Sequence, residues 1–257
     1  MRSLKRSMIL SILLVLLVVP NINAQEISLN SPIRHSYPFL YWEDSQLKGM
    51  HIDIVTDALN NLGYDVQIEG YPLNRCIRRA EKKAVDGIIS VPYDSTYDNI
   101  LSYPPDAGKA KESNWRIMQV DNVVVTHVNS NYEFEGEVSR LPSPIRIIYG
   151  RNVVEKRLAG VKGRIEKVKT NVQNFKKLLR DKRGVLITTT VTAENMYQDP
   201  RFKDKIRIHH IPLTSLSHHL AFSQDTDLTA AERREIWNEI AKLRKDYAYM
   251  LQLYAQY

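Results

Sequence analysis

The chain has 257 residues, of which 43% are hydrophobic, enough for one large domain or for two lobes with separate cores. Its formal charge is +7, and it falls to +4 without Arg2, Lys5 and Arg6 of the leader described below. So mild a basic excess does not indicate a nucleic-acid-binding surface. The single cysteine, Cys76, excludes an intramolecular disulfide. Packing alone must therefore stabilise the fold, and the helical spacing around Cys76 predicts a buried structural thiol.

Residues 1–24 have the pattern of a cleavable signal peptide. Three cations precede an apolar run over 8–19, which Pro20 ends, and Ala24 supplies a small residue before the expected cleavage at Gln25. The run is shorter than the roughly 20 residues that a membrane-spanning helix needs. No cysteine near the cleavage point is available for a lipid. We therefore expect an exported protein, with an uncleaved N-terminal anchor as the alternative.

Apolar residues along the mature chain alternate between strand and helix spacing, which is typical of α/β proteins. The first half predicts helices over 50–62 and 73–84 and strands over 64–68, 87–91 and 122–128. Prolines, a glycine and several charges predict irregular connections over 101–114 and 129–144.

A second α/β set is expected after residue 144. Its predicted strands cover 145–149, 165–168, 185–190 and 206–211, and its predicted helices cover 152–158 and a segment after Thr170. A short strand over 219–223 precedes a helical tail. Thr170 with Gln173, and Thr229 with Glu232, have the spacing of a helix-capping box.

Two extended crossings, near 115–126 and 216–223, would join these two sets. We therefore predict two lobes, with 25–120 and 218–257 in lobe 1 and 121–217 in lobe 2. Such a chain can hinge, and a cleft lies between its lobes. Ligands of open α/β sheets bind outside the carboxyl ends of strands, which would face this cleft.

Eight short segments, taken in order, resemble the type II periplasmic solute-binding proteins, in the branch of the polar amino-acid receptors of ABC importers. They are 37–39, 49–54, 62–63, 71–75, 85–87, 150–152, 221–223 and 253–257. The resemblance implies an α/β, two-lobed, periplasmic-binding-protein-like fold in which each lobe is a mixed sheet flanked by helices. It also implies a ligand trapped between closing lobes.

The resemblance also points to two ligand clamps that this sequence lacks. Receptors of this family for free amino acids place an arginine about a dozen residues after the 85–87 turn, where this chain has Asp98. They place an aspartate for the ammonium group at a strand end of lobe 2, where this chain has threonines at 188–190. A carboxylate cannot hold a carboxylate. We therefore expect a ligand other than an ordinary α-amino acid.

The remaining candidates are aromatic, charged or hydrogen-bonding residues expected to border the cleft. Aromatic faces stack on rings, sugars or cations, and an arginine or a helix N-terminus favours an anion. Plain alternatives stay open: surface or core tyrosines, a solvated helix charge at Arg75, and simple capping at Asp98 or Asn152. The candidate ligand-binding residues are Tyr37, Tyr41, Tyr71, Arg75, Tyr93, Asp98, Arg151, Asn152 and Thr189.

No motif predicts a metal, a cofactor or a catalytic nucleophile. The pairs His209-His210 and His218-His219 invite a metal interpretation, but adjacent strand residues point to opposite faces and no further ligand completes a motif. Neither a nucleophile elbow nor a glycine-rich phosphate loop occurs. We expect no metal and no cofactor.

The leading hypothesis is a non-enzymatic, monomeric periplasmic protein that binds a small polar or aromatic solute. It would deliver the solute to an inner-membrane ABC permease or report it to a sensor, and the sequence leaves both open. One alternative is a ligand-independent interaction module, because both clamps are missing. A second is a dehydratase-like enzyme, which needs a general acid in the cleft, and Glu194 is the nearest acidic residue to the strand end in lobe 2.

Overall fold

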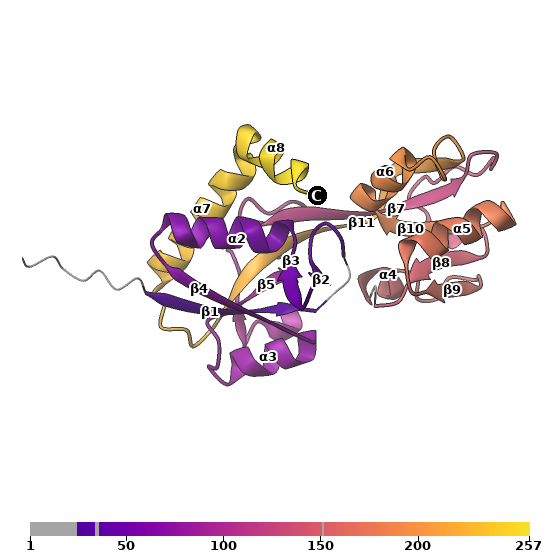
Figure 1. Ribbon diagram of the computed structural model, residues 1–257. Coiled ribbons are helices and arrows are strands. Elements are labelled where there is room, and N and C mark those ends of the chain that lie inside the picture. The colour runs from indigo at the N-terminus through magenta and orange to yellow at the C-terminus, as the bar shows by residue number, and fades with distance from the viewer. Residues whose placement is uncertain (1–24, 34–35, 151) are drawn as a thin grey trace, which may run out of the picture.

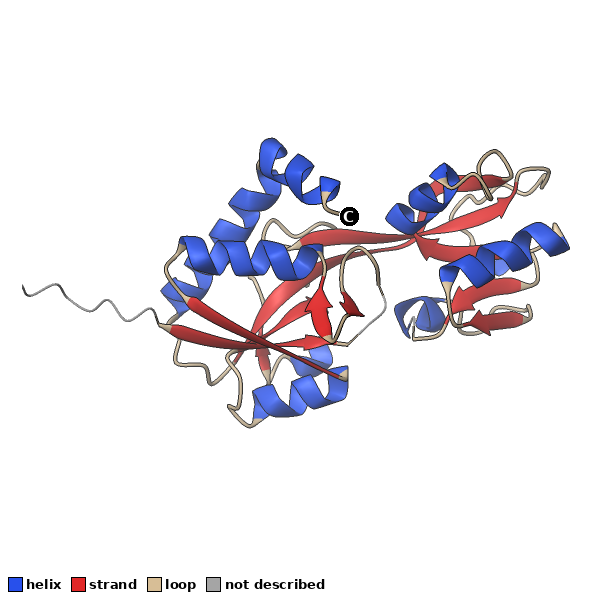
Figure 2. Ribbon diagram, in the orientation of Figure 1, coloured by secondary structure: helices blue, strands red, loops and turns tan. Residues whose placement is uncertain are grey.

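The computed structural model describes residues 25–33, 36–150 and 152–257. The leader and Arg151 lie outside the described residues. Figure 1 shows two bodies joined by a narrow waist, and Figure 2 shows strands running through both of them with helices around the outside. The chain is α/β, as predicted.

Lobe 1 is built from segments near both ends of the described chain. Its main strands are β1 (Glu26–Pro32), β4 (Asp65–Tyr71) and β5 (Gly87–Pro92), with the short β6 (Leu101–Ser102). Its helices are α2 (Met50–Asn61), α3 (Leu73–Glu81), α7 (Ala230–Lys245) and α8 (Tyr247–Ala255). The small hairpin of β2 (Tyr41–Glu43) and β3 (Gln46–Lys48) and a 3-10 turn at Ser95–Tyr97 complete it.

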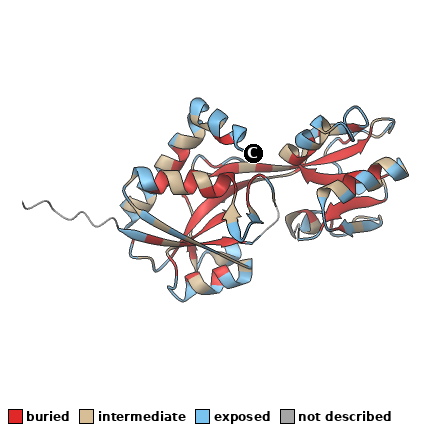
Figure 3. Ribbon diagram, in the orientation of Figure 1, coloured by how far each residue is buried: buried red, intermediate tan, exposed pale blue. Residues whose placement is uncertain are grey.

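Lobe 2 is smaller and is likewise built from strands and flanking helices. Its strands are β8 (Ile145–Ile148), β9 (Ile165–Val168) and β10 (Val185–Thr189). Its helices are α4 (Asn152–Arg157), α5 (Asn171–Asp181) and α6 (Thr190–Gln198), and Val138–Arg140 forms a 3-10 turn. Figure 3 shows that buried residues follow the strands in both lobes.

Two long antiparallel strands form the waist. These waist strands are β7 (Met118–His127) and β11 (Ile206–Ser223), and they carry one continuous sheet in the order β4-β1-β5-β11-β7-β10-β8-β9. Within lobe 1, β1 pairs in parallel with β4 and β5, and within lobe 2, β8 pairs in parallel with β9 and β10. The same pair of strands therefore connects the sheets of both lobes.

Each lobe has its own apolar packing. In lobe 1 the α2 residues Ile54, Val55 and Leu59 are buried on one face because they recur at helical spacing, and they pack in the same cluster as Ile236 and Trp237 of α7. Clusters around β8 and around α5 fill lobe 2. Within the described ranges, no helix combines the length and apolar character required to cross a membrane.

Most predicted elements are present, and two differences have clear causes. The expected strands over 206–211 and 219–223 form the single strand β11, whose pairing with β7 shifts register around Pro212. Proline lacks the N–H of a regular ladder and is tolerated at such an irregularity. The β2–β3 hairpin was not predicted, because strands of three residues show too little alternation.

The local predictions at helix starts and at Cys76 are largely confirmed. The capping box of Thr229 and Glu232 is complete. Thr170 caps α5 by accepting from the Gln173 N–H at 3.2 Å, whereas the Gln173 amide oxygen accepts from the Lys169 N–H instead of that of Thr170. The Cys76 thiol is buried.

His219 makes the stability of this fold depend on pH. It is buried on β11, where β11 pairs with β5, and its ring packs edge-on against Tyr103 with centroids 6.2 Å apart. Burial lowers the pKa of His219 from 6.5 to about 4. Its imidazole is therefore neutral in the folded chain and charged in the unfolded chain between these two values.

We predict that acidification from pH 7 to 4.5 lowers the free energy of unfolding by about 2–3 kcal/mol through this residue. The contribution is fully present above pH 6.5 and is lost as the pH falls toward 4. In urea titrations across this range, His219→Phe should lose that part of the pH slope. His210→Gln, at an exposed position of the same strand, should keep it. An unchanged slope in His219→Phe would contradict the assignment.

Candidate functional site

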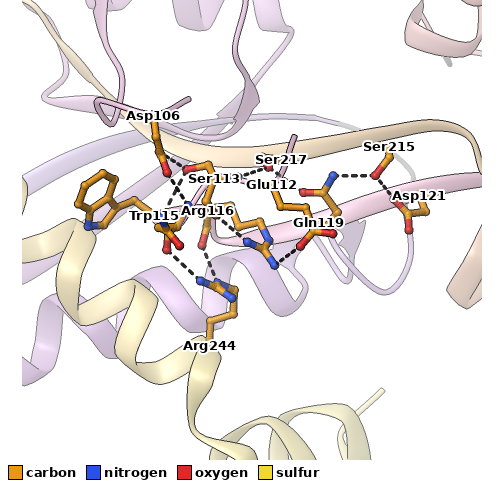
Figure 4. A network of polar contacts seen from close by, with 11 residues as sticks. Asp106, Glu112, Ser113, Trp115, Arg116, Gln119, Asp121, Ser215, Ser217 and Arg244 are labelled. Atoms are coloured by element: carbon orange, nitrogen blue, oxygen red, sulfur yellow. Dashed lines mark hydrogen bonds and ion pairs between the residues drawn. The ribbon is translucent and has the colours of Figure 1, made fainter. Parts of the chain in front are cut away.

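Polar side chains pair along the waist strands between the lobes (Figure 4). Gln119 Nε2 donates to Ser215 Oγ at 2.7 Å, and Ser217 Oγ donates to Gln119 Oε1 at 2.7 Å. Ser215 Oγ in turn donates to Asp121 Oδ1 at 2.5 Å. Ser217 is buried, whereas Gln119, Asp121 and Ser215 are partly exposed. Hydrogen bonds among partly exposed side chains can exchange with water at little cost, whereas a packed apolar core resists displacement. This region is therefore suited to bending.

Among the described residues, two polar contacts cross from lobe 1 to lobe 2, and Val191 of α6 also packs against the lobe 1 core. Thr192 Oγ1 on α6 donates to the carbonyl oxygen of Tyr37 at 3.4 Å. Lys156 Nζ on α4 lies 4.0 Å from Asp94 Oδ2. Both contacts are long, and an exposed ion pair contributes little stability. The lobes therefore face each other at two borders, the 36–41 loop with α6 and the 92–98 turn with α4.

Tyr37 and Tyr41 form an aromatic group at the first border, together with Tyr257. The ring centroids of Tyr37 and Tyr41 are 5.2 Å apart, and Tyr257 meets both rings edge-on at just over 6 Å. The Tyr37 hydroxyl donates to the Tyr257 carbonyl oxygen, and the Tyr257 hydroxyl donates to the Asp53 carboxylate on α2. These bonds fix the rings, and Tyr37 keeps 42% of its surface exposed.

Tyr93 and Asp98 lie together at the second border. The Tyr93 hydroxyl donates to Asp98 Oδ2 at 3.0 Å, and this bond raises the pKa of Tyr93. Asp94 caps its turn by accepting from the N–H and the hydroxyl of Thr96, which lowers the pKa of Asp94. This border therefore presents an ionised carboxylate at Asp94 beside an exposed aromatic ring.

Tyr71 and Arg75 lie at the end of β4 and the start of α3, outside these two groups. The guanidinium carbon of Arg75 is 4.2 Å from the centroid of the Tyr71 ring, and that of Arg79 is 5.0 Å from it. Arg79 also pairs with Glu69 at 3.0 Å. Arg75 is exposed and, among the described residues, has no ion-pair partner. It can therefore accept an anionic group.

The lobe 2 candidates lie at helix starts. Thr189 is buried and caps α6: its Oγ1 donates to Thr192 Oγ1 at 2.8 Å and accepts from the Thr192 N–H at 3.3 Å. These bonds give Thr189 a positioning role for α6. Asn152 begins α4.

A buried network of His51, Ser90 and His218 was not foreseen. Ser90 Oγ lies 2.8 Å from His51 Nδ1 and 3.1 Å from His218 Nδ1. Ser90 lies within β5 with a φ of 63°, a left-handed conformation that is unfavourable for a residue with a Cβ. All three side chains are at least 91% buried, so this serine is shielded from a substrate.

Ser90 could not be singled out from the sequence, because 167 positions separate the two histidines and no local spacing links them to a serine. His209 of the other pair makes different contacts, lying 3.1 Å from Thr126 Oγ1 and 3.0 Å from Glu133 Oε1 in lobe 2. The two histidine pairs therefore send their buried rings into separate networks.

Solved structures with the same arrangement include proteins that bind amino acids. An ancestral cationic amino-acid solute-binding protein aligns with a TM-score of 0.65 and 14% identity over 90% of this chain and 94% of its own. The L-cystine solute receptor of Neisseria gonorrhoeae, in an unliganded open conformation, aligns at 0.64 and 12% over 91% and 92%. The GluR0 ligand-binding core with L-glutamate aligns at 0.65 and 9% over 91% and 98%.

The chain has the fold of the two-lobed amino-acid solute-binding proteins. The similarity extends over nearly the whole described chain and over nearly the whole of each of these neighbours. No protein-family model matches the sequence, and no curated protein is significantly similar to it. At these low identities the similarity shows the fold alone.

We predict that Ser90→Ala lowers the free energy of unfolding by about 1–3 kcal/mol, because it leaves buried ring nitrogens without the hydroxyl. Ser90→Gly removes the same hydroxyl but relieves the left-handed backbone, which is worth roughly 1–2 kcal/mol. Urea titrations should therefore find Ser90→Gly more stable than Ser90→Ala. Equal losses in the two variants would show that the backbone at Ser90 is unstrained.

Proposed function

We propose that this chain is a non-enzymatic receptor, exported to the periplasm, that captures a small polar or aromatic solute between its two lobes. One observation carries the proposal. The waist strands between the lobes bear polar side chains, and both borders of the interlobe space bear aromatic and charged side chains. The boundaries proposed for the lobes are 25–120 with 218–257, and 121–217. The two long interlobe contacts leave room for closure over a ligand.

The residues at the borders, together with Arg75 at the start of α3, suggest the chemical class of the solute. Rings at Tyr37, Tyr41 and Tyr93 offer stacking faces, Arg75 offers a cation, and Asp94 offers an anion. An ordinary α-amino acid is disfavoured, because the resemblance to the amino-acid receptors implies an arginine at the position where this chain has Asp98. A ring-bearing solute with one anionic group fits these residues best.

Capture of the solute would work by population shift. The open form exposes both borders, and a solute that contacts both lobes binds the closed form better and thereby favours it. The difference in shape gives an inner-membrane partner, either an ABC permease or a sensor, its signal. The neighbours named above are binding proteins and receptors, which supports a non-enzymatic role.

Isothermal titration calorimetry against a panel of aromatic and polar carboxylates, amines and sugars tests this proposal. We expect saturable binding of at least one compound. For an anionic ligand, Arg75→Ala should weaken affinity about tenfold or more, since a charge-assisted hydrogen bond contributes about 1.5–3 kcal/mol. The matched control is Arg78→Ala, which removes an exposed cation from the same helix and should change affinity less than about twofold.

Absence of binding across the whole panel would contradict the capture of a small solute. Equal effects of Arg75→Ala and Arg78→Ala would contradict the role assigned to Arg75. Thermal unfolding of each variant, measured alongside, confirms that a loss of binding does not reflect a loss of folding.

A further inference from the structure

Helix α8 presents two different faces. Its inner face packs on lobe 1 through the buried Leu253, and the Tyr249 hydroxyl donates to Asp57 Oδ2 on α2 at 2.8 Å. Asp246 caps the helix by accepting from the Tyr249 N–H at 3.0 Å. The helix is therefore held in place from one side and at its start.

Its outer face carries large apolar side chains in solvent. Tyr247, Leu251 and Tyr254 are 76%, 51% and 46% exposed, and their spacing of four and three residues places them on one side of the helix. We call these three residues the α8 stripe. A contiguous exposed apolar patch of this kind marks an interaction site more often than isolated apolar residues do.

A groove of about 660 Å³ lies where α7 ends and α8 begins, and its lining ends at Asp246, the residue before Tyr247 of the stripe. Its lining includes Trp115, Asn238, Lys242 and Lys245. The Trp115 indole Nε1 donates to Asn238 Oδ1 at 2.8 Å, and the guanidinium carbon of Arg234 lies 5.3 Å from the centroid of the Trp115 ring. We call this feature the α7–α8 groove.

The rim of the groove is cationic. Lys245 has no ion-pair partner among the described residues, while Lys242 pairs with Glu239 at 3.0 Å and keeps its side chain 73% exposed. Glu239 is itself only 11% exposed, whereas the exposed Asp246 carboxylate keeps its charge while it caps α8. The exposed charges at the rim are therefore two lysines and one carboxylate, which leaves an excess of positive charge.

The wall of the groove is preformed and joins the waist (Figure 4). Arg244 donates from Nε to the Arg116 carbonyl oxygen at 3.1 Å and from Nη2 to the Asn114 carbonyl oxygen at 2.9 Å. The Ser113 N–H donates to Ser217 Oγ at 3.0 Å, on waist strand β11. A docked partner would thus rest on a fixed surface immediately beside the hinge.

The two ends of this surface differ in charge, which sets a direction for a partner. The lysines lie at the end where α8 begins. At the other end, Glu194 of α6 adds to the effect of burial in raising the pKa of Tyr254, so a negative charge is near. A bound segment therefore places its carboxylates over the lysines and its uncharged apolar residues over Tyr254.

The size and shape of the surface decide what can occupy it. The exposed parts of the three stripe residues amount to roughly 300 Å², well below the about 800 Å² per partner of a stable protein interface. A second copy packed through the stripe alone would thus be weakly held. A membrane is flat and would leave the groove unfilled, whereas a peptide segment can place a side chain in it.

We propose that the α7–α8 groove and the α8 stripe together bind an acidic, amphipathic segment of a partner protein, with apolar side chains on the stripe and carboxylates over Lys242 and Lys245. The site is centred on the groove, away from the borders of the interlobe space, with its Tyr254 end near α6 of the first border. It does not require that a solute be bound.

Selection of peptides from a random phage-displayed library on the purified protein tests the proposal. Enriched peptides should carry Asp or Glu together with aromatic or aliphatic residues, and a synthetic copy should change the fluorescence of Trp115. The double variant Lys242→Glu, Lys245→Glu and the variant Leu251→Ser should each weaken its binding about tenfold or more. Raised salt should weaken it as well.

The matched control is Lys162→Glu, Lys203→Glu, which makes the same charge change at exposed positions of lobe 2 and should leave affinity unchanged. Four outcomes would overturn the proposal: no enrichment on the wild type relative to the variants, enrichment of basic peptides, self-association that Leu251→Ser abolishes, or binding to anionic vesicles without binding to peptides. Unchanged circular dichroism and solute binding in the variants would show that they are folded.

Discussion

The pairing of β7 with β11 is the interaction on which the other features of this molecule depend. It carries one sheet through two lobes whose apolar cores are separate. Since the lobes share little else, the side chains on these two strands decide how freely they move. Gln119, Ser215 and Ser217 make that region polar, and polar pairs can be remade in a second geometry without opening a cavity.

The structural groups and the groups proposed for solute binding lie in different parts of the molecule. Rigid elements such as β5 and α2 hold the buried network of His51, Ser90 and His218, which stabilises the inner edge of lobe 1. The groups that we propose for solute binding lie further out, on turns and helix starts. Closure changes the distance between these groups while each lobe keeps its own packing. A solute that contacts both borders therefore stabilises one arrangement of an otherwise weakly constrained pair.

Much of this fold could be predicted from periodicity. The helices beginning at Met50, Leu73 and Ala230 and the buried strands beginning at Gly87 and Val185 follow directly from apolar spacing and capping residues. The continuity of β11 could not, because Pro212 interrupts the pattern and only pairing with β7 carries the strand across it.

The site was less predictable than the fold. The positions of Tyr37, Tyr93 and Asp98 beside the interlobe space follow from their places at strand ends, and their binding role remains a prediction. The hydrogen bond from Tyr93 to Asp98 and the burial of Thr189 depend on side-chain contacts. The spacing of residues along the sequence does not indicate such contacts. The Ser90 network requires three segments distant in sequence to meet, and such long-range contacts leave no local signal.

The most direct test of the hinged-receptor account is a distance between spin labels on the two lobes, measured by pulsed electron resonance. Cysteines introduced at Glu81 and Arg157 would carry the labels, since both positions are exposed whereas Cys76 is buried and should stay unlabelled. A solute that binds in calorimetry should replace a long, broad distance distribution with a shorter, narrower one. A distribution that does not change at saturating solute would contradict the account.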